Sequence, residues 1–197
     1  MKEYVVKTVS EPVEWGEIER EELEQCKWSP NPAPKAYVQS VFIEGKGLIV
    51  HIESMEKPAR AENYEPDSAV WEDSCLEFFF SDGGEKYVNL EVNANAALRA
   101  SIGKDRHERT LLLNEDYTMP QVSAVEEESS WQVFFFVPGK SYEEFFNKKL
   151  ESGSIVMANF YSCGDKTPAP HYAAWNEVDT SAPDFHRPEF FGKLIIS

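Results

Sequence analysis

The chain has 197 residues, enough for one domain with a substantial hydrophobic core. Hydrophobic residues make up 42% of the sequence and aromatic residues 13%, which excludes an intrinsically disordered composition. The net charge of −16, from 19 basic and 35 acidic residues, excludes a basic surface for the phosphate backbone of nucleic acid.

The absence of long apolar runs and the spacing of the cysteines limit the kinds of protein that the sequence can encode. No run of 18 apolar residues occurs, so we expect no membrane-spanning helix and no membrane partner. The N-terminus lacks the apolar stretch of a signal peptide, which predicts a cytoplasmic protein as given, or a secreted one if a leader was removed. Cys26, Cys75 and Cys163 are odd in number and widely spaced, which argues against a disulfide framework and CxxC metal sites. We expect a monomer.

Most of the sequence predicts short strands separated by turns. A polar helix is expected first, at 17–26, before a hairpin around the turn at 45–47. A second hairpin follows the polar loop 55–69 and turns at 82–85. The predicted strands are 36–44, 48–53, 75–81, 87–93, 97–102, 121–125, 131–137, 154–162 and 190–196.

Only one further segment, 141–150, reads as helical. Ser141 would cap it, with Glu144 three residues later as in a capping box. The stretch 163–189 has four prolines and little periodicity, so it is either a functional loop or contains structure that the pattern does not reveal. About eight to ten strands and one or two short helices predict an all-β fold, an antiparallel β-sandwich of the immunoglobulin-like kind, as a single domain over 1–197.

The alternation in the second hairpin divides it into two faces. Leu76, Phe78 and Phe80 should face the core with the apolar residues of 87–93. The opposite face then gathers amide, carboxylate and aromatic groups, namely Glu77, Phe79, Tyr87, Asn89, Glu91 and Asn93. Such a face is either an ordinary solvated surface or a hydrogen-bonding platform for a polyhydroxylated ligand, to which Arg99 on the next strand could donate.

Two of the five tryptophans are candidates for stacking on the apolar face of a sugar ring. Trp71 immediately precedes a strand, and Trp175 lies in the long proline-rich segment. Each could instead be a core anchor, as Trp131 is expected to be from its alternation within 131–137. Trp15 and Trp28 flank the first predicted helix and are expected to pack there.

Two blocks of sequence resemble carbohydrate-binding module family 9. The first runs from Trp71-Glu72 through Glu77 and an aromatic strand to the Y-x-N-x-E-x-N pattern of 87–93. The second is Ala174-Trp175-Asn176-Glu177 with the closing stretch 185–194. The similarity extends from about residue 35 to residue 197.

The resemblance implies a DOMON-related β-sandwich that binds carbohydrate without catalysis. Better-known members accompany xylanases and bind the ends of xylan and cellulose chains, and small sugars. By this resemblance one sugar unit would lie between Trp71 and Trp175, with polar contacts from Glu77, Arg99 and Asn176. Asn93, on the polar hairpin face, and Glu72, beside Trp71, are further candidates for ligand binding.

The resemblance also implies a structural calcium ion, although no cofactor is required for binding. Oxygen-rich turns that could serve as calcium ligands, or that could be simple turn chemistry, contain Asp82, Glu85, Asn114, Glu115 and Asp116. The sequence has no EF-hand spacing.

Three other activities remain open from the residues alone. A glycoside hydrolase would need paired carboxylates, for which Glu72, Asp73 and Glu77 are candidates and Glu77 could face Glu91. A haem-binding DOMON-like redox domain would need axial ligands. The possible haem ligands, which have no telling spacing, are Met55, Met119, Met157, His51, His107, His171 and His186. Cys75 reads as a small buried hydrophobe rather than a nucleophile, because adjacent acids would raise its pKa.

Overall fold

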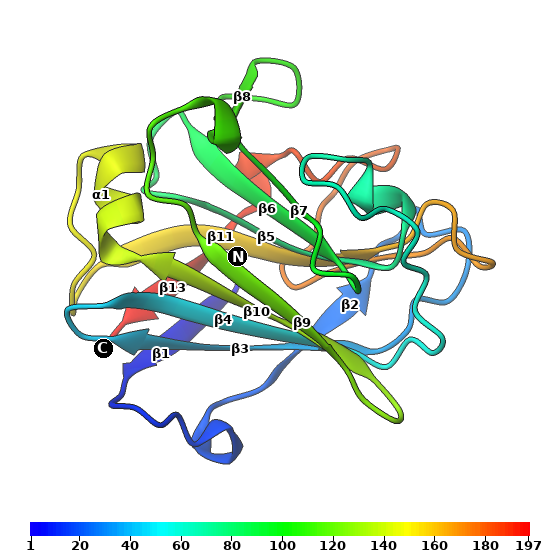
Figure 1. Ribbon diagram of the computed structural model, residues 1–197, viewed down its shortest axis with the longest axis horizontal. Helices are drawn as coiled ribbons and strands as arrows, with labels where there is room; N and C mark the ends of the chain where they lie inside the picture. The colour runs from blue at the N-terminus through cyan, green and yellow to red at the C-terminus, as the bar shows by residue number, and fades with distance from the viewer.

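The computed structural model describes all 197 residues and consists of two packed sheets, shown as two layers in Figure 1. One sheet contains β2 (Glu21–Gln25), β3 (Ala36–Ile43), β4 (Gly47–Ser54), β10 (Trp131–Pro138) and β9 (Gln121–Glu126), in that order. The other contains β8 (Arg109–Leu111), β7 (Leu98–Gly103), β6 (Tyr87–Asn93), β5 (Cys75–Ser81), β11 (Ile155–Cys163) and β12 (Tyr172–Ala174), with β13 (Gly192–Ile196) also paired to β11. The predicted β-sandwich is confirmed.

Two connections join the layers at their edges. Strand β12 pairs with β2, and β1 (Glu3–Thr8) pairs first with β13 and then with β3. The pairings of β1 are parallel, whereas all others are antiparallel, so the antiparallel prediction holds for every strand except the first. None of the helical segments has the length and hydrophobicity of a membrane span.

The core follows the alternation of the hairpin β5–β6. Leu76, Phe78 and Phe80 are fully buried and share one large hydrophobic cluster with Val88, Leu90 and Val92. The opposing sheet contributes Trp131, Val133 and Phe135 to the same cluster, and the Phe78 and Phe135 rings meet edge to face at 6.1 Å. The inward-facing residues assigned from parity are therefore the residues that hold the two layers together.

The helix predicted over 17–26 is wrong. Residues Trp15–Glu17 form a single 3-10 turn (η1), and Glu21–Gln25 form strand β2 between β12 and β3. Within β2 only Leu23 is buried, because its neighbours alternate outward. Pairing on both sides therefore overrides the helical preference of a glutamate-rich segment.

The second predicted helix exists but begins and ends earlier. Helix α1 spans Gly139–Phe146, starts directly after Pro138 and ends at Asn147 in the left-handed conformation. The predicted capping box is wrong, because Ser141 lies inside the helix and its Oγ donates to the Thr118 carbonyl oxygen at 2.6 Å. The Glu144 carboxylate accepts from the Thr118 backbone N–H, so both side chains tie α1 to the segment before β9.

Three short 3-10 turns complete the secondary structure. They are η2 (Val70–Glu72), η3 (Leu112–Asn114) and η4 (Pro188–Phe190). The first carries Trp71 to the entrance of β5. The long segment 163–189 contains β12, whose three residues pair with the end of β11.

Candidate functional site

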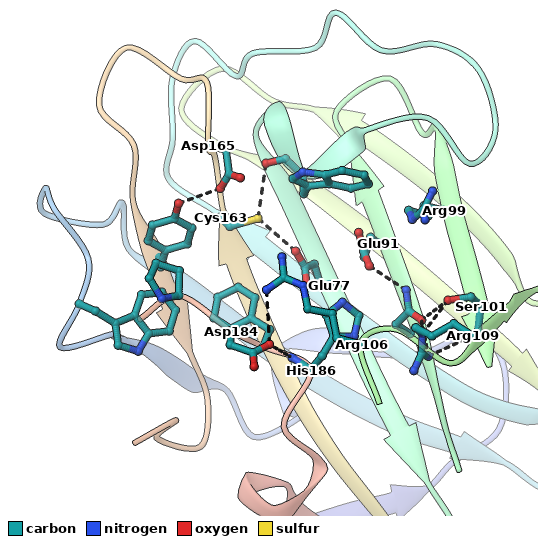
Figure 2. A pocket seen from close by; sticks show the side chains of 16 residues that line it. Glu77, Glu91, Arg99, Ser101, Arg106, Arg109, Cys163, Asp165, Asp184 and His186 are labelled. Carbon is teal, nitrogen blue, oxygen red and sulfur yellow. Dashed lines mark hydrogen bonds and ion pairs between the residues drawn. The ribbon is translucent and has the colours of Figure 1, made fainter. Parts of the chain in front are cut away.

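A cavity of about 240 Å³ lies on the face of β5–β8 that points away from the core. Its floor is polar and comes from neighbouring strands, and it consists of Glu77, Asn89, Glu91, Ser101 and Cys163. Glu77 and Glu91 are register partners across the hairpin, as parity predicted. Figure 2 shows the two carboxylates and Arg106 converging on the same space.

Aromatic rings from separate loops line the same cavity. Trp71 comes from η2, where the Arg99 guanidinium lies 5.1 Å from its ring centroid. Trp28 packs against Tyr172 and Phe185, with ring centroids 5.0 and 5.5 Å apart. The rings supply flat apolar surface beside a polar floor, which is the combination that a sugar ring requires.

A hydrogen-bond network holds the floor in place. The Asn89 amide nitrogen donates to Glu91 Oε1 at 2.7 Å, and Arg109 Nε donates to Asn89 Oδ1 and Ser101 Oγ, both at 2.9 Å. The Arg109 guanidinium also stacks on the Tyr87 ring at 4.1 Å. Because Arg109 is occupied by these contacts, it positions Asn89 and Glu91.

The two floor glutamates are almost completely buried, at 3% and 4% exposed. Burial raises the pKa of Glu91 to about 7, although the nearby Arg99 opposes the shift. Burial and then the negative charge of Glu91 raise the pKa of Glu77 well above its usual value, and the Cys163 thiol donates to Glu77 Oε1 at 3.1 Å. The cavity therefore keeps two carboxyl groups that hold their protons more tightly than surface acids do.

Charged groups from the loops close the rim. Arg106 lies 3.7 Å from Asp184, and Asp165 accepts from the Tyr172 hydroxyl at 2.8 Å. Burial and the neighbouring arginines lower the pKa of His186 to about 3, so its ring is neutral, and its Nδ1 shares a hydrogen bond with the Tyr87 hydroxyl at 2.9 Å. With Arg99 on the floor side, the rim offers cationic donors next to carboxylate acceptors.

Three of the seven predicted ligand-binding residues lie at this cavity. Trp71, Glu77 and Arg99 line it together. Glu72 does not line it, and its carboxylate pairs with Lys166 at 2.8 Å.

Trp175, Asn176 and Asn93 also do not line the cavity, which corrects the predicted pairing of Trp71 with Trp175. Trp175 is fully buried in the main core against Phe160, and its indole N–H donates to Glu21 at 3.0 Å. Asn176 is nine-tenths buried and bonds to the Lys2 N–H and the Phe190 carbonyl. Trp175 and Asn176 border a different hollow, beside Lys2 and Cys26.

Asn93 has a structural position below η2. Its amide nitrogen donates to Asp73 Oδ2 and to the Asn63 carbonyl oxygen, both at 2.8 Å. Its Oδ1 accepts from the backbone of Asn95 and Ala97, so every strong hydrogen-bonding atom of the side chain is occupied within the protein. Asn93 shares the parity of Glu77 but sits at the end of the strand, where loops cover it.

The residues missed from sequence come chiefly from loops. They are Trp28, Arg106, Asp165, Tyr172, Asp184, Phe185 and His186. Phe185 and His186 belong to the closing stretch 185–194 that carries the family resemblance, but no local pattern marks the others, because only the fold brings residues 28, 106 and 185 to one place. Ser101 had a usable signal, since it alternates with Arg99 on the strand next to Glu91.

Two of the acids considered as calcium ligands form ion pairs with lysines. The Asp82 carboxylate pairs with Lys148, and Glu85 pairs with Lys104, so these acids are directed to lysines. No three acidic side chains bring their oxygens together anywhere in the chain. Among the histidines and methionines considered for haem, only His186 lines the cavity, and its Nδ1 is occupied by the Tyr87 hydroxyl.

Comparisons with solved structures show the same fold in carbohydrate-binding proteins. A candidate carbohydrate-binding protein from Bacteroides uniformis ATCC 8492 is 26% identical, with a TM-score of 0.84, over 100% of this chain and 99% of that one. A family 9 carbohydrate-binding module from Caldicellulosiruptor kristjanssonii is 14% identical in two complexes. Its cellotriose complex gives a TM-score of 0.68 over 100% and 94% of the two chains, and its glucose complex gives 0.69 over 100% and 96%.

No curated protein matches the sequence. The sequence model of Carbohydrate-binding family 9 matches residues 8–196, almost the whole chain. The resemblance noted at Trp71–Asn93 and at the C-terminus is therefore confirmed, and the chain belongs to Carbohydrate-binding family 9.

Proposed function

We propose that the cavity binds one sugar unit, as a monosaccharide or as the end of a longer saccharide chain, and that no bond is broken. The observation that carries the proposal is the combination of aromatic rings and buried carboxylates in a single cavity of a family 9 chain. Its volume of about 240 Å³ lies below the ~300–1,000 Å³ typical of drug-sized ligands, which suits a small saccharide.

In this proposal the sugar ring stacks on Trp71, and its other apolar surface contacts the Tyr172 and Phe185 rings. Glu77 and Glu91 accept hydrogen bonds from sugar hydroxyls. Arg99 donates to them, because only one of its five N–H groups is engaged within the protein, with the Asp67 carbonyl oxygen. Since stacking and hydrogen bonds must offset desolvation and ordering, we expect affinities in the micromolar to millimolar range.

The arrangement of the two glutamates favours binding over glycoside hydrolysis. Hydrolases place two carboxyl groups so that they flank the scissile bond. Glu77 and Glu91 instead project side by side from paired strands of one floor, on the same side of any ligand. Both carboxyls thus suit hydrogen bonding to hydroxyls of a single sugar face.

The test is calorimetric titration with glucose, cellobiose, cellotriose, xylose and xylobiose. At about pH 8, above the raised pKa of Glu91, Glu91→Gln should weaken binding by about fivefold, because a charged acceptor contributes roughly 1 kcal/mol more than a neutral one. Glu115→Gln is the matched control, since Glu115 is exposed and outside the cavity.

Absence of heat with every sugar, or equal affinity for Glu91→Gln and wild type, would overturn the proposal. Prolonged incubation with cellotriose distinguishes binding from glycoside hydrolysis. Shorter products that disappear with Glu91→Gln would replace binding by hydrolysis.

A further inference from the structure

Two thiols and a carboxylate converge at the edge of the cavity floor. Cys75 on β5 and Cys163 on β11 are register partners, and Glu77 projects from the same face two residues after Cys75. The Cys75 and Cys163 sulfurs and a Glu77 carboxylate oxygen all lie within 4.8 Å of one another. All three side chains are buried, at 0%, 3% and 3% exposed.

The geometry points to a zinc site formed by Cys75, Cys163 and Glu77, which we propose as a second ligand site at the edge of the sugar cavity, sharing Glu77 with it. Tetrahedral zinc has Zn–S distances of about 2.3 Å and Zn–O distances of about 2.0–2.2 Å, which place two sulfurs about 3.8 Å apart and a sulfur and an oxygen about 3.5 Å apart. The observed spacing, with Cys163 Sγ 3.1 Å from Glu77 Oε1, needs only small side-chain shifts to reach these values.

The fourth coordination position would face the cavity. Cys163 and Glu77 both line it, so a zinc ion has a path from solvent and space for one exchangeable water. Binding replaces three Zn–water bonds by two Zn–S bonds and one Zn–O bond, and the two S–H protons and the proton held by the buried Glu77 carboxyl leave to solvent. Two thiolates and a carboxylate leave one net negative charge around Zn²⁺, and Arg106 on the cavity rim lies close enough to Glu77 to offset it.

Softness of the ligands selects the type of metal. Thiolate ligands favour zinc over calcium or magnesium, which require oxygen donors. The same register pairing brings two thiols within reach of oxidation, so a Cys75–Cys163 disulfide is the competing outcome, formed with a small-molecule disulfide as oxidant.

The experiment is a Co²⁺ titration of the protein kept reduced by a phosphine, followed by displacement with Zn²⁺. We expect one equivalent of cobalt to give a thiolate-to-metal charge-transfer band and the intense visible bands of a tetrahedral ion, both abolished by one equivalent of zinc. Cys75→Ala and Cys163→Ala should each remove at least half of the charge-transfer intensity. Cys26→Ala is the matched control, since Cys26 is a buried cysteine in a different cluster.

The absence of a charge-transfer band in the reduced wild type would overturn the zinc site, as would a band that survives both substitutions. If a variant fails to fold, the charge-transfer intensity of the wild type gives the number of thiolates bound to the cobalt ion. Two bound thiolates support the site, and one or none refutes it. Loss of two thiols to a disulfide despite the phosphine would also overturn it. The titration contains no sugar, so failure of the sugar proposal would leave this result unaffected.

Discussion

Trp71 and Trp175 should respond to truncation in opposite ways. Trp175 is fully buried, and its ring packs so closely that a Cβ added at Gly192 would lie 2.4 Å from Trp175 Cζ3. Trp175→Ala therefore leaves a core cavity and an unpaired Glu21 contact, at a cost of about 3–5 kcal/mol. For a chain of this size, each kcal/mol lowers the melting temperature by about 2–4 °C, so we expect a decrease of roughly 6–20 °C.

Trp71 is half-buried at the cavity and forms no part of the main core. Trp71→Ala should leave the melting temperature within a few degrees of wild type, while it removes about 1 kcal/mol of stacking beyond the lost apolar contact. Together these losses weaken sugar binding by roughly tenfold or more.

The assay is a thermal melt and a calorimetric sugar titration on both variants and wild type, with each variant serving as the control for the other. A Trp175→Ala protein with wild-type stability and lost binding would restore the two-tryptophan clamp. A Trp71→Ala protein with wild-type affinity would remove Trp71 from the site.

Two further predictions concern buried acids. Burial raises the pKa of Glu91 from 4.5 to about 7, so the native state holds this proton more tightly and stability falls as pH rises between those values. Between about pH 5 and pH 8, the free energy of unfolding of the wild type should therefore decrease by up to about 3 kcal/mol more than that of Glu91→Gln, as measured by thermal melts at both pH values. Equal decreases in the two proteins would contradict the reasoning. Asp73 is fully buried and accepts from the backbone of Glu62 and Asn63 and from both the Asn63 and Asn93 amides. Asp73→Ala should cost about 3–5 kcal/mol in chemical denaturation, and an unchanged midpoint would show that the loop does not depend on it.

The hairpin β5–β6 was predictable because a period of two is a local property. Leu76, Phe78 and Phe80 alternate with polar or outward-facing residues. Because a slip of one residue would turn these side chains away from the core, only one register of β5 with β6 buries them. The bounds 75–81 and 87–93 agree with the structure residue for residue. The same alternation predicts that Glu77 and Glu91 lie together on the outer face, where they are register partners.

Features that depend on distant partners were not predictable in this way. Strand β2 carries four polar residues in five, and only its pairing with β12 and β3 makes it extended. Trp175 stands in an irregular, proline-rich segment, yet its backbone N–H donates to the Phe160 carbonyl and its ring enters the core. A loop-like sequence around a tryptophan therefore does not indicate that the ring is exposed.

The outer face of β5 and β6 shows why parity identifies a face but not a site. Phe79 and Tyr87 lie on it, yet they are buried in a second apolar cluster with Tyr161 and Phe191, which the C-terminal segment covers. Farther along the same strands, Glu77, Asn89 and Glu91 line the cavity, and Phe185 stacks on Tyr161 at 4.1 Å where the two regions meet. The segment before β13 thus closes one half of the face and forms a wall of the other. A change that loosens Phe185 should therefore affect stability and sugar binding together, whereas one at Trp71 should affect binding alone.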